Sequence, residues 1–303
     1  MEEIGSSERV GTGLLGGETV TPVLVRSNKN LLELALWLAG PRACSVIVTD
    51  GGSRVLGVAT VLDLLKVIDL NGRNPAKALM SVLAGEVARP VPILRLGGRV
   101  QEGLFEVLES RERCGVLLDG DDKPIGVVSV LDALNVLMDT DHLAGSLGDL
   151  PAHSASLRLR SLQSDADVRH AISALVARDG EPLAVGSSGF VVTAQSLAAA
   201  VLGPQRLREF VEDPDGVLGS YLLYEVRALV RPAVISREMR LRKAVQLMSD
   251  SGEQVLRLND GSFVTACSIG DFFLERLRHS GTAAVREPRW DVGSGRNRSY
   301  GPT

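Results

Sequence analysis

The stretch Gly57-Val-Ala-Thr60-Val-Leu-Asp63 recurs about seventy residues later as Gly126-Val-Val-Ser129-Val-Leu-Asp132. In each copy the motif follows a short apolar run and opens a helical run, which predicts a strand that turns directly into a helix. This corner places a small hydroxyl and a carboxylate beside the free backbone N–H groups of a helix N-terminus, which attract anions. A chain that builds such a corner twice is expected to consist of repeats.

The same order of elements surrounds both corners: strand, helix, strand, turn, strand and helix. The turns, such as Asp50-Gly51-Gly52, lie between β-branched runs and support a hairpin in each repeat. Beyond residue 156 the same order recurs twice more in a weaker form. The four repeats predict corners at Thr60, Ser129, Thr193 and Ser268.

The third and fourth corners depart from the motif. In the third repeat, Ser196 stands where the carboxylate is expected, and Phe190 stands at the glycine position. In the fourth repeat, Ser268-Ile-Gly-Asp271 keeps the carboxylate, but Thr265 replaces the glycine. We therefore expect the first two repeats to carry any ligand and the last two to serve mainly in assembly.

The composition is that of an ordinary globular chain without a basic surplus. Of 303 residues, 45% are hydrophobic and 4% aromatic, so we expect an aliphatic core. The formal net charge of −4 argues against a nucleic-acid-binding surface. No stretch approaches the roughly 18 apolar residues that cross a bilayer, and the N-terminus lacks the pattern of a secretory signal. Because Cys44, Cys114 and Cys267 fit a reducing compartment, we expect a cytoplasmic protein.

Two interpretations of the corner are open at this point. Thr or Ser followed three residues later by an acidic residue is a common helix N-cap, which stabilises a helix by about 1 kcal/mol without any ligand. Alternatively, the carboxylate suits the paired hydroxyls of a ribose, and the hydroxyl beside helix N–H groups suits a phosphate. The glycine supports the second interpretation, because it removes a side chain where another group could approach the backbone.

The order of elements, the repeat length and the closing motif resemble the cystathionine-β-synthase (CBS) domain. The best matches are Val55-Leu-Gly-Val-Ala-Thr-Val-Leu-Asp-Leu-Leu65 and Pro124-Ile-Gly-Val-Val-Ser-Val-Leu-Asp-Ala-Leu134. The resemblance covers roughly residues 18–280, strongly in the first two units and weakly in the last two. It implies an α/β (α+β) fold of β-α-β-β-α units, paired about pseudo-twofold axes, with small sheets packed together and helices outside.

The resemblance divides the chain into two Bateman-type pairs. The first pair spans 18–140, with units of about 18–70 and 77–140. A linker, 141–156, leads to a second, degenerate pair at 157–280, with units of about 157–203 and 204–280. The polar segment 1–17 and the arginine-containing tail 281–303 are expected to be disordered.

Paired CBS domains hold adenosine-containing ligands in two clefts. The resemblance implies that Asp63 and Asp132 bind ribose hydroxyls, while Thr60 and Ser129 approach ribose or phosphate. The adenine is expected against the neighbouring unit. Supporting residues are therefore Thr19, Leu24, Arg42 and Ala43 for the Asp132 cleft, Val87, Pro92 and Arg113 for the Asp63 cleft, and Gly57 and Gly126 at the corners. Ser268 and Asp271 mark a possible site in the second pair.

These expectations describe a non-catalytic regulatory protein, an energy sensor that binds AMP, ADP, ATP or an S-adenosyl compound. The four histidines show no metal-ligand spacing, and neither a catalytic constellation nor a covalent cofactor is expected. A homodimer and a protein effector are expected partners, whereas a membrane and nucleic acid are not. Two alternatives stay open: a scaffold that binds no nucleotide, and a nucleic-acid-associated regulator acting through the arginine-containing tail.

Overall fold

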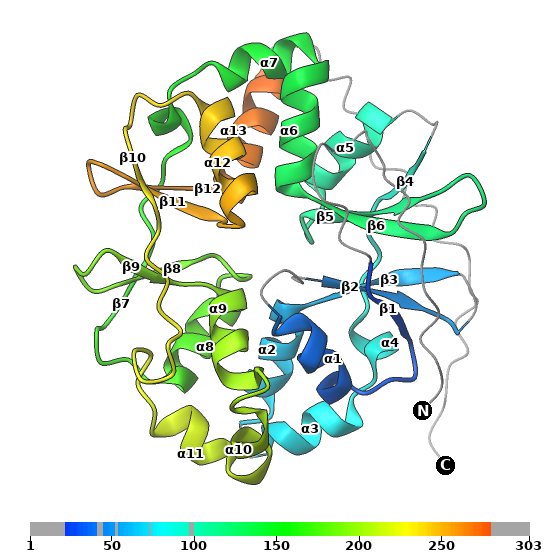
Figure 1. Cartoon of the computed structure of the whole chain (residues 1–303), viewed down its shortest axis with the longest axis vertical. Helices are drawn as coiled ribbons and strands as arrows, with labels where there is room; N and C mark the ends of the chain where they lie inside the picture. The colour runs from blue at the N-terminus through cyan, green and yellow to red at the C-terminus, as the bar shows by residue number, and fades with distance from the viewer. Residues whose placement is uncertain (1–21, 41–44, 52–53, 73, 97–99, 280–303) are drawn as a thin grey trace.

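The computed structural model describes residues 22–40, 45–51, 54–72, 74–96 and 100–279. Four three-stranded sheets run through this part of the chain (Figure 1). Their strands, in chain order, are β1 (Leu24–Arg26), β2 (Ser45–Thr49), β3 (Val55–Thr60), β4 (Ile93–Arg95), β5 (Cys114–Leu118), β6 (Pro124–Ser129), β7 (Ser161–Leu162), β8 (Leu183–Val185), β9 (Phe190–Val192), β10 (Val234–Ile235), β11 (Val255–Leu258) and β12 (Phe263–Thr265).

The helices alternate with these strands. In chain order they are α1 (Leu31–Leu38), α2 (Val61–Leu70), α3 (Pro75–Ser81), α4 (Ala84–Val87), α5 (Val100–Glu109), α6 (Val130–Thr140), α7 (His142–Gly148), α8 (Val168–Val176), α9 (Ala194–Leu202), α10 (Leu207–Glu212), α11 (Pro214–Gly219), α12 (Leu241–Ser251) and α13 (Ala266–His279), with a 3-10 helix at Ala152–Ala155. Short polar side chains start several of them. Asn30 accepts a hydrogen bond from the Glu33 N–H at 2.9 Å, for example.

All four sheets have the same topology. In each, the second strand is parallel to the first and antiparallel to the third. The first two sheets even share a register shift at the same place, between Val48 and Thr49 and between Leu117 and Leu118. The repetition seen in the sequence is therefore a repetition of structure, and the predicted fold class of β-α-β-β-α units is confirmed.

The sheets face each other in two pairs across the middle of the molecule (Figure 1). Between the first two sheets lies a small apolar cluster that includes Ile47, Val58 and Val116. Between the last two sheets lies another, built around Val191 and Phe263. Each sheet thus buries one face against the other sheet of its pair, as expected for paired units.

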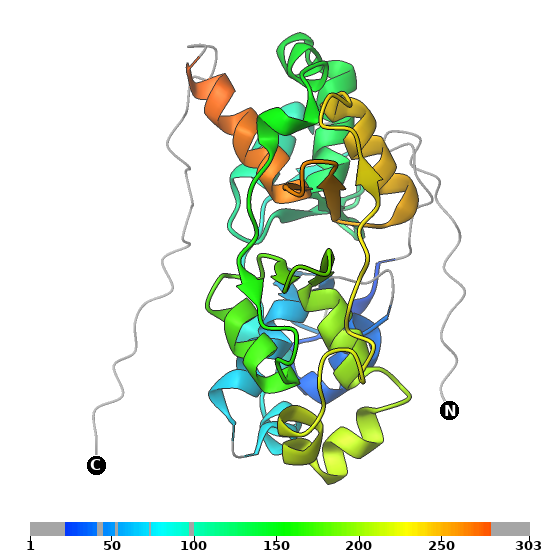
Figure 2. The same ribbon diagram turned by 90° about the vertical axis from the view of Figure 1, so that its left-hand side faces the viewer.

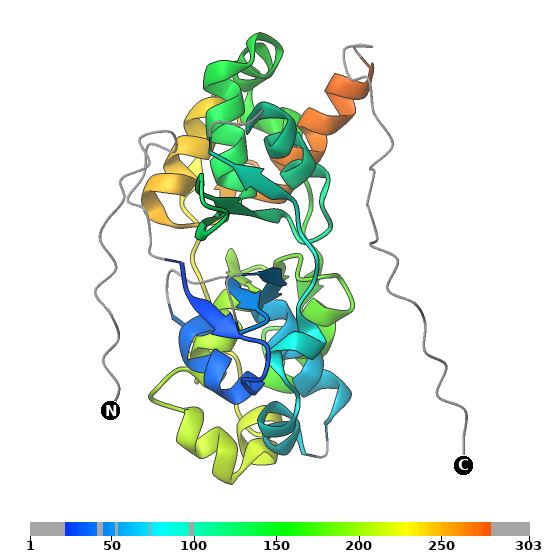
Figure 3. The same ribbon diagram turned by 90° about the vertical axis from the view of Figure 1, so that its right-hand side faces the viewer.

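Helices cover the outer faces of the sheets and join the two pairs. Helices α1 and α2 of the first unit share one aliphatic core with α8 and α9 of the third. Helices α5 and α6 of the second unit share another with α12 and α13 of the fourth. Both side views show these helical halves on either side of the sheet layer (Figures 2 and 3). The first unit therefore packs on the third, and the second on the fourth.

Some sequence expectations lie outside the described residues or need correction. The segments 1–17 and 281–303, expected to be disordered, lie outside them. The predicted linker, 141–156, holds α7 and the 3-10 helix, and the division into domains at these limits stays a prediction. Cys267 is exposed in the first turn of α13, Cys114 is buried, and Cys44 lies outside the described residues. Across the described ranges, no helix has both the length and the apolar character needed to cross a membrane.

Candidate functional site

The first predicted corner lies where β3 turns into α2. Thr60 is the N-cap of α2, and its backbone N–H and hydroxyl both donate to Oδ2 of Asp63, at 2.9 and 2.8 Å. One carboxylate oxygen of Asp63 is therefore used by the helix cap. Any ligand at this corner would have to bind the other oxygen, Oδ1.

Oδ1 of Asp63 faces an arginine that the sequence did not single out. Nη2 of Arg89 lies 2.8 Å from Oδ1, and Nη1 of the same guanidinium lies 3.0 Å from Oε1 of Glu112. Burial lowers the pKa of Arg89, but the Asp63 and Glu112 carboxylates more than offset this, so its pKa lies above the ordinary value. Asp63 is itself buried, with 3% of its surface exposed. The first corner is thus closed by the protein's own cation.

The segment that carries Arg89 also leaves no room for a side chain at Gly57. The backbones of Val58 and Arg89 form an antiparallel bridge, with N–H to O distances of 3.0 and 2.9 Å. A Cβ atom on Gly57 would lie 2.1 Å from the carbonyl oxygen of Arg89. Another group does approach the backbone at this glycine, and that group is the chain itself.

The second corner, where β6 turns into α6, is more open. The backbone N–H and hydroxyl of Ser129 donate to Oδ2 of Asp132 at 2.8 and 2.7 Å, as at the first corner. Asp132 is only half-buried, and within the described ranges its Oδ1 has no hydrogen-bond or ion-pair partner. A Cβ atom on Gly126 would meet no described atom within 4 Å. This corner therefore presents a carboxylate oxygen at the start of a helix.

In the second pair, both corners carry serine in place of the carboxylate. Thr193 caps α9, and it exchanges backbone-to-side-chain hydrogen bonds with Ser196, each 3.0 Å long. Thr265 and Ser268 make the same exchange, also at 3.0 Å, at the start of α13. The predicted fourth corner, with Ser268 as the cap, is therefore wrong by three residues, because α13 begins at Ala266.

Comparison with known proteins then identifies the fold. No family model matches the sequence, and no curated protein matches it. A solved structure from Methanocaldococcus jannaschii, described as a candidate archaeal homologue of γ-AMPK, matches with a TM-score of 0.68 at 14% identity, over 84% of this chain and 96% of that one. A CBS-domain-containing protein from Agrobacterium tumefaciens matches with a TM-score of 0.33 at 22% identity, over 40% of this chain and 93% of that one. The fold is that of tandem CBS domains.

The CBS fold explains where the other predicted residues lie. Val87 ends α4 and packs partly buried on the core of the first and third CBS units. Pro92 is buried, and its carbonyl oxygen accepts the Val116 N–H at 2.9 Å. Both residues flank the segment that carries Arg89, and their contact with adenine stays a prediction. Thr19, Arg42 and Ala43 lie outside the described residues.

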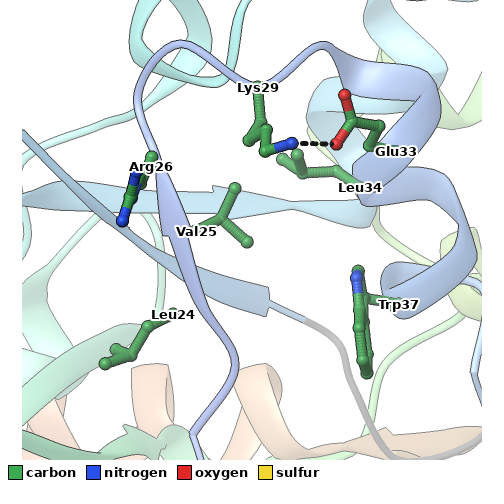
Figure 4. Close-up of a pocket in the computed structure, with 7 residues that line it drawn as sticks. All are labelled: Leu24, Val25, Arg26, Lys29, Glu33, Leu34 and Trp37. Atoms are coloured by element: carbon green, nitrogen blue, oxygen red, sulfur yellow. Dashed lines mark ion pairs between the residues drawn. The ribbon is translucent and has the colours of Figure 1, made fainter. Parts of the chain in front are cut away.

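Leu24 lines a hollow beside the edge strand β1. Leu24 is 51% exposed, and Trp37 on α1, across the hollow, is 53% exposed. Figure 4 shows the two side chains on opposite sides of the hollow, and the Lys29–Glu33 ion pair, 2.8 Å long, at one end. Apolar surface is thus accessible at the predicted adenine-contacting residue, although Trp37 was not predicted.

Arg113 and Asp271 were predicted in different sites, but the structure brings them together. Arg113 lies just before β5, in the left-handed region at φ 51°, and its guanidinium pairs with the Asp271 carboxylate of α13. The same guanidinium donates to the Leu108 carbonyl. This pair connects the second CBS unit to the fourth, and the binding of a ligand by either residue stays a prediction.

A second cross-unit cluster was also missed. Asp179, which follows α8 in the third CBS unit, accepts from Lys66 of the first unit at 3.0 Å and from Arg111 of the second unit at 3.0 Å. The hydrogen bonds from Lys66 and then Arg111 hold the pKa of Asp179 below its ordinary value. The only sequence signal was the charged run Arg111-Glu112-Arg113 before a strand, which does not reveal its partners. No three His, Cys, Asp or Glu side chains in the described ranges gather where they could hold a metal ion.

Proposed function

We propose that this chain is a non-catalytic regulatory protein that binds an adenosine-containing ligand in its first CBS pair and passes the bound state to a protein effector. The observation that carries the proposal is the Asp132 corner. There, a half-buried carboxylate keeps one oxygen without a partner in the described ranges, at the N-terminus of α6. A ribose hydroxyl can donate to that oxygen, and the helix N-terminus favours a nearby phosphate.

The choice of an adenosine compound rests on the CBS resemblance of the motif. It is supported by the similarity to the archaeal structure described as a candidate homologue of γ-AMPK. The proposed ligands are AMP, ADP, ATP or an S-adenosyl compound. A homodimer in the cytoplasm is part of the same proposal, and sedimentation of the purified protein with and without ligand tests the dimer.

One observation favours a second candidate, a scaffold that binds no nucleotide. The Thr193 and Thr265 corners are capped reciprocally, as the Ser129 corner is, although they lack the carboxylate. Capping alone therefore accounts for the hydroxyl at every corner. Under this interpretation, the carboxylates of the first pair serve only the helices that they start.

Isothermal titration of the purified protein with AMP, ADP, ATP and S-adenosylmethionine decides between the two. The proposal expects saturable binding of at least one compound, weakened tenfold or more by Asp132→Asn, which corresponds to about 1.4 kcal/mol. Thr265→Ala is the matched control, because it removes a cap in a CBS unit without a carboxylate. Absence of binding to all four compounds would leave the scaffold as the function.

A further inference from the structure

The two corners of the first CBS pair differ in what the outer carboxylate oxygen meets, and the inference from this difference rests on the proposed function. At the second corner, Oδ1 of Asp132 has no partner in the described ranges. At the first corner, Oδ1 of Asp63 lies 2.8 Å from Nη2 of Arg89, and the Asp63 side chain is only 4% exposed. A ribose hydroxyl can reach Asp63 only after the guanidinium has left.

Arg89 is held at both ends. Its backbone is bridged to Val58 by two hydrogen bonds, and its guanidinium is bonded to Asp63 and, at 3.0 Å, to Glu112, whose side chain is 13% exposed. The guanidinium carries a positive charge that two partly desolvated carboxylates attract, whereas a ribose hydroxyl can offer the same carboxylate only a hydrogen bond. A neutral ribose hydroxyl therefore competes poorly with this guanidinium for the Asp63 carboxylate.

The surroundings of Gly57 and Gly126 differ in the same way as those of the two carboxylates. Gly57 lies against the Arg89 backbone, where a Cβ atom would lie 2.1 Å from the carbonyl oxygen, whereas a Cβ atom on Gly126 would meet no described atom within 4 Å. The repeated motif therefore has two uses in one pair. At the first corner it admits an internal segment, and at the second no described segment lies against the glycine.

We propose that Arg89 is the internal occupant of the Asp63 cleft and the residue that decides which cleft of the first pair binds ligand. The first CBS pair then takes one adenosine compound per chain, at Asp132. The Asp63 cleft accepts a ligand only when the Arg89 guanidinium is removed. The sequence motif predicts two equivalent clefts, and a single arginine ahead of β4 makes them unequal.

Titration with AMP, ATP and S-adenosylmethionine tests this proposal in five proteins: wild type, Asp132→Asn, Asp63→Asn, Arg89→Ala and Arg89→Ala/Asp63→Asn. Wild type is expected to bind one equivalent, with affinity reduced tenfold or more by Asp132→Asn and by less than about twofold by Asp63→Asn. Arg89→Ala is expected to bind a second equivalent, and Asp63→Asn in that background removes it. Arg89→Met, which keeps the aliphatic stem, replaces Arg89→Ala if the latter does not fold.

Two results would overturn the proposal: a tenfold loss of wild-type affinity in Asp63→Asn, or an unchanged stoichiometry in Arg89→Ala. Its failure is distinguishable from failure of the proposed function. If wild type binds nothing but Arg89→Ala binds one equivalent, the assignment of Arg89 stands and the Asp132 site fails. A double-mutant cycle between Arg89 and Asp63, measured by urea unfolding without ligand, is expected to show that the two side chains stabilise the protein together. Additive effects of the two substitutions would also overturn the proposal.

Discussion

At the scale of single residues, the first two corners show that identical motifs can reach different environments. Both Asp63 and Asp132 give one oxygen to the helix cap, and both caps have nearly the same distances. What differs is the group opposite the other oxygen, which comes from a distant segment. The local sequence therefore predicts the cap, but it does not predict whether the carboxylate is available to a ligand.

Because of this difference, replacing aspartate with asparagine should lower the free energy of unfolding more at position 63 than at position 132. Asp63→Asn leaves the partly buried Arg89 guanidinium with one carboxylate partner instead of two, and should lower the free energy of unfolding by about 1–3 kcal/mol. Asp132→Asn disturbs only a cap and should cost about 1 kcal/mol or less. Urea unfolding of both variants without ligand measures the difference. Equal losses in the two variants would mean that the ion pair between Arg89 and Asp63 does not stabilise the protein in solution.

Asp179 is expected to make the free energy of unfolding depend on pH. Hydrogen bonds from Lys66 and Arg111 lower its pKa, so its stabilising effect is complete above the ordinary aspartate value of about 3.9 and is lost as pH falls through the lower folded value. Asp179→Asn removes this effect, and asparagine tolerates the local φ of 49°. In urea unfolding, the variant should be less stable than wild type at pH 7, and the difference should shrink towards pH 3. A constant difference would exclude this role.

At the scale of elements, the sequence predicted most strands and helices because apolar runs and turn residues alternate clearly. The predicted order of strand, helix, strand, turn, strand and helix recurs even in the weaker repeats, where α9 (Ala194–Leu202) follows β9 and α12 (Leu241–Ser251) follows β10. The fourth corner failed for a physical reason. Ser268-x-x-Asp271 matches the motif, but the Thr265 hydroxyl lies one turn earlier and caps the helix first. The closure by Arg89 could not be predicted, because it depends on a bridge between distant backbone segments.

The corrected start of α13 predicts which residue stabilises that helix. Thr265→Ala removes the side-chain acceptor of the Ser268 N–H and should lower the free energy of unfolding by about 1 kcal/mol, within the range of 0.5–2 for such caps. Asp271→Ala removes only an exposed ion pair with Arg113 and should cost between about 0 and 1 kcal/mol. Thermal unfolding of the two variants ranks them. A larger loss of stability in Asp271→Ala than in Thr265→Ala would support the corner predicted from the sequence, Ser268-x-x-Asp271.

At the scale of the whole molecule, the two CBS pairs are not independent bodies. Each helical core combines residues of one unit from each pair, and the described contacts between the pairs include α2 with α8 and α6 with α12. Ion pairs add to this connection, since Arg111 and Arg113 of the second unit reach Asp179 of the third and Asp271 of the fourth. A structural change in the first pair can therefore act directly on the second pair, whose Thr193 and Thr265 corners have serine in place of the carboxylate.

This shared core predicts that the chain unfolds as one cooperative unit. Ile172 of α8 is 1% exposed and belongs to the core formed with the first CBS unit, so Ile172→Ala should lower the free energy of unfolding by about 2–5 kcal/mol. Leu70→Ala, at a side chain that is 81% exposed in α2, is the control and should change it by about 0.5 kcal/mol or less. Calorimetry should show a single transition that moves as a whole in Ile172→Ala. Two transitions, of which Ile172→Ala shifts only one, would mean that each pair folds alone. Ligand binding in the first pair could then not be transmitted through this core.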